Sequence, residues 1–114
     1  MAVTLGERKS GDVYVLQASG FIDTSTVSVV EEKITKLFAE GKYKLVVDLS
    51  GVEFVSSAGW GVFVAFLKKM RDKDGDLKLS GMIEKVAKVF TLMEFDSLMD
   101  AYADEDAAVK SFSR

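Results

Sequence analysis

The sequence predicts one α/β domain built on a mixed, mostly parallel β-sheet. Short runs of β-branched and aliphatic residues alternate with segments whose apolar residues recur at helical spacing. The 114 residues are the length of one domain, so we expect a single domain over residues 1–114. The chain contains no proline and no Ser/Gly-rich run, and therefore no visible linker.

The first part of the chain predicts two strands and a helix. Residues 3–5 and 13–18 are rich in strand-forming residues and are separated by a polar turn. Gly20 is expected to end the second strand, and residues 23–26 offer several helix N-caps. An amphipathic helix ending at Gly41 is predicted by the apolar spacing of Val27, Val30, Ile34, Leu37 and Phe38.

The second part of the chain repeats strand and helix. Residues 44–49 form a nearly continuous apolar run, which is typical of a strand buried on both faces. After a loop over residues 50–57, we expect a helix over 58–72. The remaining predicted elements are a strand over 77–80, a helix around Phe90, a short strand over 98–102 and a helix beginning in the acidic run 104–106.

The predicted order is therefore β-β-α-β-α-β-α-β-α, with about four or five strands and four helices. Right-handed crossovers between parallel strands place the strand-to-helix loops along one edge of the sheet. Ligands and partners of open α/β sheets usually bind at that edge. We therefore expect a functional site in those loops.

Composition excludes several kinds of chemistry. The chain has no cysteine, which rules out disulfides and thiolate metal sites. It has no histidine, which removes the usual general base, the commonest metal ligand and the Ser-His-Asp triad. No Asp/Glu cluster has calcium-loop spacing, and no glycine-rich phosphate loop is present. We expect no catalytic residue, no metal and no cofactor.

Charge and hydropathy predict a soluble cytoplasmic protein. A net charge of −3 at pH 7 without a basic stripe does not favour direct binding of nucleic acid. The N-terminus carries charges by its seventh residue and has no apolar run typical of a signal peptide. The longest apolar stretch, residues 62–67, is too short to cross a membrane. We expect no nucleic acid and no membrane among the partners.

Most of the functional information lies in residues 46–61, VVDLSGVEFVSSAGWG. Ser57 is expected at or beside the N-cap of the helix that follows, where its side chain can accept a hydrogen bond from a free backbone N–H. The free N–H groups and the helix dipole also favour an anion, so the fold would accommodate a phosphate on Ser57. Helix capping alone also explains a serine at this position.

The residues after Ser57 predict a contact surface. Ala58, Gly59 and Gly61 are small, so the backbone of another protein could approach the helix start closely. Trp60 is a candidate interface residue, because tryptophan is enriched at binding hot spots. The alternative for Trp60 is a place in the core.

Residues 48–61, DLSGVEFVSSAGWG, resemble the signature of the STAS-domain anti-sigma-factor antagonists, which are bacterial partner-switching regulators. That signature is a strand ending in aspartate, a small turn, an aromatic residue and an acceptor serine. A small residue, a glycine, a bulky apolar residue and another glycine follow. Residues 20–23, 86–93 and 107–109 are similar to further family segments in the right order. The resemblance covers essentially the whole chain and implies a single STAS domain.

The resemblance implies a binding switch and not an enzyme. Members with this signature bind an anti-sigma factor that is also a serine kinase, which frees a sigma factor for transcription. The kinase phosphorylates the acceptor serine and the antagonist dissociates, after which a serine phosphatase resets it. Counted from the signature glycine, Gly59, the acceptor is Ser57. Ser56 stands where many members carry an acidic residue, and it is the minor alternative acceptor.

The expected binding surface combines these residues with an acidic one. Asp23 matches the family's acidic residue near the acceptor loop, and a helix N-cap is its alternative role. We expect a monomer or a weak dimer. The expected partner-binding residues are Asp23, Ser56, Ser57, Ala58, Gly59 and Trp60.

Other functions remain open at this point. STAS domains also serve as non-phosphorylated adaptor subunits in transport or stress-signalling assemblies. An esterase would need a glycine where Val55 stands in the nucleophile elbow, and without histidine only a serine–lysine dyad remains. A phospho-receiver domain would use Asp48, but the sequence shows no clustered acidic pocket around it.

Overall fold

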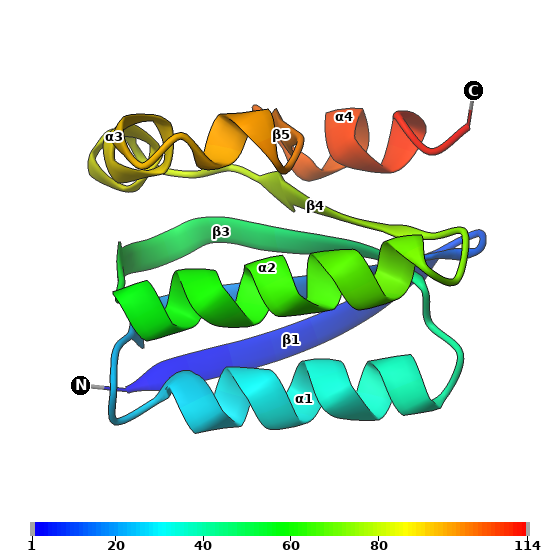
Figure 1. Ribbon diagram of the computed structural model, residues 1–114, viewed down its shortest axis with the longest axis horizontal. Helices are drawn as coiled ribbons and strands as arrows, with labels where there is room; N and C mark the ends of the chain where they lie inside the picture. Colours follow the sequence, from blue (N-terminus) through cyan, green and yellow to red (C-terminus); the bar gives the residue numbers. More distant parts are fainter. Residues whose placement is uncertain (1, 114) are drawn as a thin grey trace.

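Strands and helices follow one another in the predicted order, with one short 3₁₀ helix (η1) added before the last strand (Figure 1). The structure, a computed structural model, describes residues 2–113, so residues 1 and 114 of the predicted domain lie outside the described residues. The elements are β1 (Val3–Ser10), β2 (Val13–Ile22), α1 (Val27–Ala39), β3 (Lys44–Val55), α2 (Ser57–Arg71), β4 (Asp76–Ser80), α3 (Glu84–Leu92), η1 (Phe95–Ser97), β5 (Ala101–Tyr102) and α4 (Glu105–Lys110).

The five strands form one mixed sheet in the order β1-β2-β3-β4-β5. β1 and β2 are antiparallel and form a hairpin in which Ser10 pairs with Val13. The pairs β2–β3, β3–β4 and β4–β5 are all parallel. The prediction of a mixed, mostly parallel sheet is confirmed. The parallel connections bring the carboxyl ends of β2 and β3 to the same edge.

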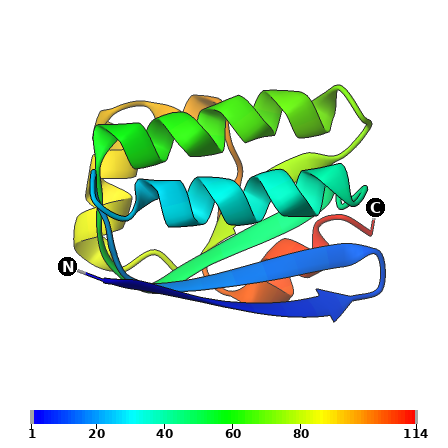
Figure 2. The same cartoon turned by 90° about the horizontal axis from the view of Figure 1, so that it is seen from below.

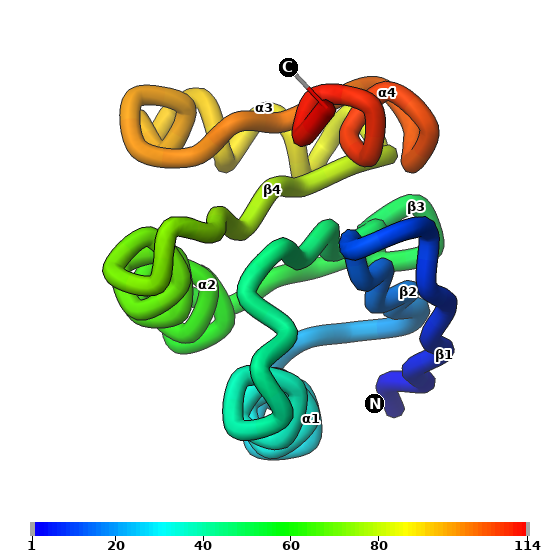
Figure 3. Tube along the Cα trace, turned by 90° about the vertical axis from the view of Figure 1, so that its right-hand side faces the viewer, coloured from blue at the N-terminus to red at the C-terminus, as the bar shows by residue number. Residues whose placement is uncertain are grey.

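Side chains alternate between the two faces of the sheet, and helices cover both faces (Figure 3). Leu45, Val47 and Leu49 of β3 pack in the larger core with α1 and α2, which lie together on one side. Val46 of β3 packs in a smaller core with Ala108 of α4 on the other side. Because β3 is buried on both faces, its sequence is apolar without a break over several residues.

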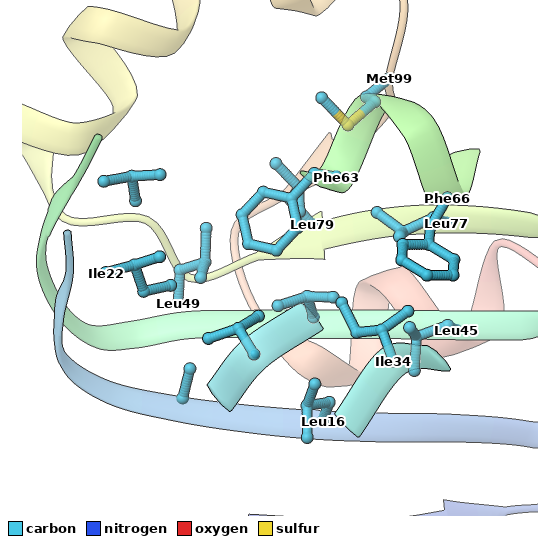
Figure 4. Packing of buried hydrophobic residues seen from close by; sticks show 14 of the residues in the cluster. Leu16, Ile22, Ile34, Leu45, Leu49, Phe63, Phe66, Leu77, Leu79 and Met99 are labelled. Atoms are coloured by element: carbon cyan, nitrogen blue, oxygen red, sulfur yellow. The ribbon is translucent and has the colours of Figure 1, made fainter. Parts of the chain in front are cut away.

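The larger core is closed by an aromatic cluster at the start of α2. Figure 4 shows the interior of this core, where Phe63 lies near Leu79 and Met99. Trp60 is only 3% exposed, and its ring stacks on Phe95 with the ring centroids 5.3 Å apart. The Trp60 ring is also 5.8 Å from the ring of Phe90 and 6.0 Å from that of Phe63. This cluster joins α2, α3 and η1.

The predicted end of the second strand at Gly20 is wrong. β2 continues through Gly20 to Ile22, with an irregular register between Gly20 and Phe21. Gly20 has a φ of 105°, and a side chain there would collide with the carbonyl oxygen of Ala2. Glycine therefore serves as a bend that lets the strand pass close to the chain start.

Other predicted boundaries also differ, and the first strand, expected over residues 3–5, runs on to Ser10. The loop expected over residues 50–57 is wrong, because β3 runs on to Val55 while Phe54 and Val55 pair with the end of β2. The last strand is shorter than the predicted 98–102, because only residues 101 and 102 pair with β4. Met99, inside that predicted strand, is buried in the larger core instead.

We expect Trp60→Ala to lower the free energy of unfolding by about 3–5 kcal/mol, because it empties space among three packed rings. Urea unfolding followed by circular dichroism measures the loss. The matched control is Leu92→Ala at a position 71% exposed, which should change stability by about 0.5 kcal/mol or less. Equal losses in the two variants would contradict this account of the core.

Candidate functional site

The candidate site lies at the edge where β2 and β3 end and α1 and α2 begin (Figure 2). The two loops are joined there by a hydrogen bond, in which the backbone N–H of Ser56 donates to the carbonyl oxygen of Ile22 at 2.7 Å. The β2–β3 ladder runs up to the Ile22–Val55 pair just before this bond. The position of the paired serines is therefore set by the sheet.

Ser56, and not Ser57, is the N-cap of α2. Ser56 has extended backbone angles, and its Oγ accepts a hydrogen bond from the backbone N–H of Gly59 at 3.2 Å. Serine and aspartate are about equally good N-caps, so Ser56 provides the capping that an acidic residue at this position would provide. Its side chain is half-buried and already engaged.

Ser57 is the first residue of α2, beside the N-cap as predicted, and it is exposed. Its hydroxyl has no hydrogen-bond partner among residues 2–113. The backbone N–H groups of Ser57 and Ala58 lie in the first turn, where no intrahelical carbonyl can accept from them. The hydroxyl therefore stands in the positive potential of a helix start and is accessible to a second macromolecule.

The two small residues after Ser57 have different roles. Ala58 is exposed and remains a candidate contact residue. Gly59 is buried, and a Cβ there would lie 2.9 Å from Ile22 Cγ2 and 2.9 Å from Val55 Cγ1. The expectation that Gly59 admits a partner's backbone is therefore wrong, because its small size serves packing inside the protein. Gly61 is exposed with open space above it, so it remains a candidate for that predicted role.

The prediction of Trp60 as a partner-binding residue is corrected by its burial. The indole packs among aromatic rings of α2, α3 and η1, which explains why so large a residue follows the exposed helix start. Its Nε1–H has no hydrogen-bond partner among residues 2–113. Trp60 thus packs in the core below the site and holds the start of α2 against α3 and η1.

Asp23 lies in the neighbouring loop and is not the N-cap of α1. The N-cap is Thr26, whose hydroxyl donates to the carbonyl oxygen of Phe21 at 2.6 Å. The Asp23 carboxylate accepts from the Ser25 hydroxyl at 2.6 Å and from the Ser25 backbone N–H at 2.9 Å. These bonds hold the pKa of Asp23 below its usual value of 3.8, so the carboxylate is ionised at neutral pH. Asp23 places one negative charge at this edge.

Phe54 is a surface residue of the site that sequence reasoning missed. Its ring is 48% exposed on β3, two residues before the N-cap. It lines an apolar hollow of about 260 Å³ whose other walls include Val55, Trp60 and Val89. The signal was present in the sequence, because the apolar residues Val52 and Val55 flank Phe54 in a stretch that continues the strand.

We expect Ser56→Ala to lower the free energy of unfolding by about 1 kcal/mol, because the N–H of Gly59 loses its capping acceptor. Chemical denaturation of both proteins measures this difference. Ser56→Asp is the matched control and should keep most of the stability, since aspartate also caps. The capping assignment fails if alanine and aspartate give the same stability.

Comparison with known proteins identifies the family. The family model for the STAS domain matches residues 7–108. The chain belongs to the STAS-domain family. Among curated relatives, the anti-sigma-B factor antagonist of Staphylococcus epidermidis is 31% identical over 88 residues, covering 77% of this chain and 82% of the relative. The protein of the same name from Staphylococcus aureus strain NCTC 8325 / PS 47 is 29% identical over 86 residues, covering 75% of this chain and 80% of the relative.

Solved structures share the fold. The anti-sigma factor antagonist from Mycobacterium paratuberculosis has a TM-score of 0.91 and is 26% identical, covering 99% of this chain and 96% of that protein. The Bacillus protein SpoIIAA in its phosphorylated form has a TM-score of 0.72 and is 20% identical, covering 97% of this chain and 99% of that protein. The predicted membership among anti-sigma factor antagonists is confirmed, and this is a family of regulators rather than catalysts.

None of the helices within residues 2–113 is long and apolar enough to span a membrane.

Proposed function

We propose that this protein is an anti-sigma-factor antagonist whose unphosphorylated form binds a kinase-type anti-sigma factor and so frees a sigma factor. Phosphorylation of Ser57 ends that binding, and a serine phosphatase restores it. The observation that carries the proposal is the exposed, unengaged hydroxyl of Ser57 at the first position of α2. The family membership supports an anti-sigma factor as the partner.

The local structure favours Ser57 over Ser56 as the acceptor. The Oγ of Ser56 caps α2 and is half-buried, so a kinase would have to break the start of the helix to reach it. The hydroxyl of Ser57 needs no such rearrangement. A phosphate on Ser57 would also meet the free N–H groups and the positive dipole end of α2, which favour an anion.

The switch follows from charge and not from a change of fold. A phosphate adds roughly −1.5 to −2 charges near neutral pH, next to a loop in which Asp23 is already ionised. Against a partner surface that packs closely here, desolvation and like-charge contact would cost several kcal/mol. Each ~1.4 kcal/mol weakens affinity tenfold, so one phosphate suffices to release the partner.

We expect Ser57→Asp to weaken binding to the cognate anti-sigma factor by at least about tenfold, because it places a charge in the contact surface. Ser57→Ala should bind and should take up no phosphate from the kinase and ATP. Calorimetry measures the binding, and phosphosite mapping by mass spectrometry measures the modification.

The control is Ser113→Asp, which adds the same charge at an exposed position just after α4, and α4 lies on the other side of the sheet from α2 (Figure 3). It should bind like the unchanged protein. A phosphate mapped to Ser56 would overturn the acceptor assignment. Partner binding without phosphorylation by any candidate anti-sigma kinase would instead favour a non-phosphorylated adaptor.

Phe54 extends the proposed contact surface beside Ser57. Exposed aromatic rings are common binding hot spots, and truncating one typically costs about 2 kcal/mol or more. We expect Phe54→Ala to weaken anti-sigma-factor binding by roughly thirtyfold, as measured by calorimetry. Leu98→Ala, at a position of similar exposure (44% against 48%), is the control and should bind normally. Equal affinities of the two variants would exclude Phe54 from the interface.

A further inference from the structure

A group of polar side chains fastens α4 to the sheet, on the face opposite α1 and α2 (Figure 3). Glu105, the first residue of α4, is its centre. Arg8 Nε of β1 donates to Glu105 Oε1 at 2.8 Å, and Gln17 Nε2 of β2 donates to Glu105 Oε2 at 2.7 Å. The Glu105 carboxyl is also hydrogen-bonded to the Asp48 carboxyl of β3. One side chain thus joins α4 to three neighbouring strands.

Asp48 is held almost inside the protein. Asp48 is only 8% exposed, and its Oδ1 accepts a hydrogen bond from the backbone N–H of Ser50 at 3.0 Å. The chain also passes close by at Gly81, where a Cβ would lie 2.7 Å from Asp48 Oδ1. A glycine at position 81 therefore leaves space for the Asp48 carboxyl group beside the cavity that it lines with Glu105.

The fold builds an acidic pocket around this pair. Asp48 and Glu105 line a cavity of about 440 Å³ together with Asp104 and Asp106. The expectation that Asp48 has no clustered acidic groups near it is therefore wrong, because α4 brings them from the far end of the sequence. Within residues 2–113, no group of three or more carboxylates is placed to hold a metal ion.

Two carboxyl groups can share a hydrogen bond only while one of them carries a proton. We propose that Asp48 and Glu105 form a proton-linked latch, in which one shared proton fastens α4 to the sheet and its loss loosens α4. Without the proton, two negative charges lie in one site, where Arg8 is the one cation among residues 2–113 that contacts the pair directly. This inference is independent of the role proposed for Ser57.

The other charged side chains on this face of the sheet do not offset the negative charge of Asp48 and Glu105. Asp104 and Asp106 of α4 line the same cavity and add negative charge. Lys78 of β4 lies on this face of the sheet, but its Nζ donates to Ser111 Oγ at 2.7 Å and lies over the ring of Phe112. Tyr102 of β5 adds its ring near Lys78 Nζ. Arg8 of β1 therefore remains the cation that contacts the pair.

The two members of the latch have opposite pKa changes. Burial and the hydrogen bond with Glu105 raise the pKa of Asp48 above 3.8. The proton donated by Asp48, with further donation by Gln17 and Arg8, lowers the pKa of Glu105 to about 2. Glu105 supports the folded state above its ordinary value of 4.5, and this support is lost only as the pH falls toward about 2.

Asp48 is therefore the member that loses its proton at a pH above its ordinary value of 3.8. A carboxyl whose pKa is raised on folding contributes its full stability below the unfolded value of 3.8. That contribution to stability is lost as the pH rises through the pKa of Asp48 in the folded state. The attachment of α4 should consequently weaken as the pH rises above the folded-state pKa of Asp48.

Hydrogen–deuterium exchange of the α4 amides tests the latch in the full chain. After correction for intrinsic exchange, protection of the N–H of Ala108 and Ser111 should fall as the pH rises through the folded-state pKa of Asp48. Protection falls by up to tenfold for each unit by which the pKa of Asp48 in the folded state exceeds its pKa in the open state. Asp48→Asn keeps a donor for Glu105 without the charge, so its protection should not change with pH.

The matched control is Asp106→Asn, which removes a carboxylate of the same cavity that shares no proton, and it should keep the original pH dependence. A second measurement needs no variant: the carboxyl carbon of Asp48 should titrate above 3.8 in nuclear magnetic resonance spectra of the unchanged protein. Protection that does not change with pH, or an Asp48 that titrates at 3.8, would overturn the latch.

Discussion

The hydrogen bond from the N–H of Ser56 to the carbonyl oxygen of Ile22 is the contact on which the site depends. It holds the start of α2 against the end of β2. The two elements pack so closely that a Cβ at position 59 would collide with Ile22 and Val55, and glycine avoids this collision. A helix pinned in this way exposes its first residue and buries its fourth. The exposed serine and the buried tryptophan are therefore two results of one junction.

Each face of the sheet has an apolar core, the α4 face adds a group of polar side chains, and β3 contributes to both faces. Its residues Leu45, Val47 and Leu49 fill an apolar core under α1 and α2, whereas Asp48 meets the polar group that holds α4. The strand then delivers the chain to the N-cap of α2. A substitution in β3 therefore affects the core, the attachment of α4 or the edge of the sheet that carries Ser57, depending on its position and on the face to which it points.

The periodicity of the sequence was sufficient for the order of the elements, because alternation and helical spacing are local properties. It was insufficient where contacts with a segment distant in the sequence determine an element boundary or the burial of a residue. β3 continues past Leu49 because β2 pairs with it, and Gly20 bends β2 without ending it because the chain start lies beside it. The same holds for the site: the place of Ser57 followed from local capping rules. The burial of Trp60 depends on rings more than 25 residues away, and the partner of Asp48 lies on α4.

Trp60 is the single tryptophan of the chain, and its indole lies where α2, α3 and η1 meet, close to the edge of the sheet that carries Ser57. The protein therefore carries an intrinsic optical reporter whose emission can be assigned to one place without labelling. Because the Nε1–H lacks a partner among residues 2–113, its spectrum will respond to any water or polar group that reaches it. Binding at this edge and loosening of this core can thus be followed through the same chromophore.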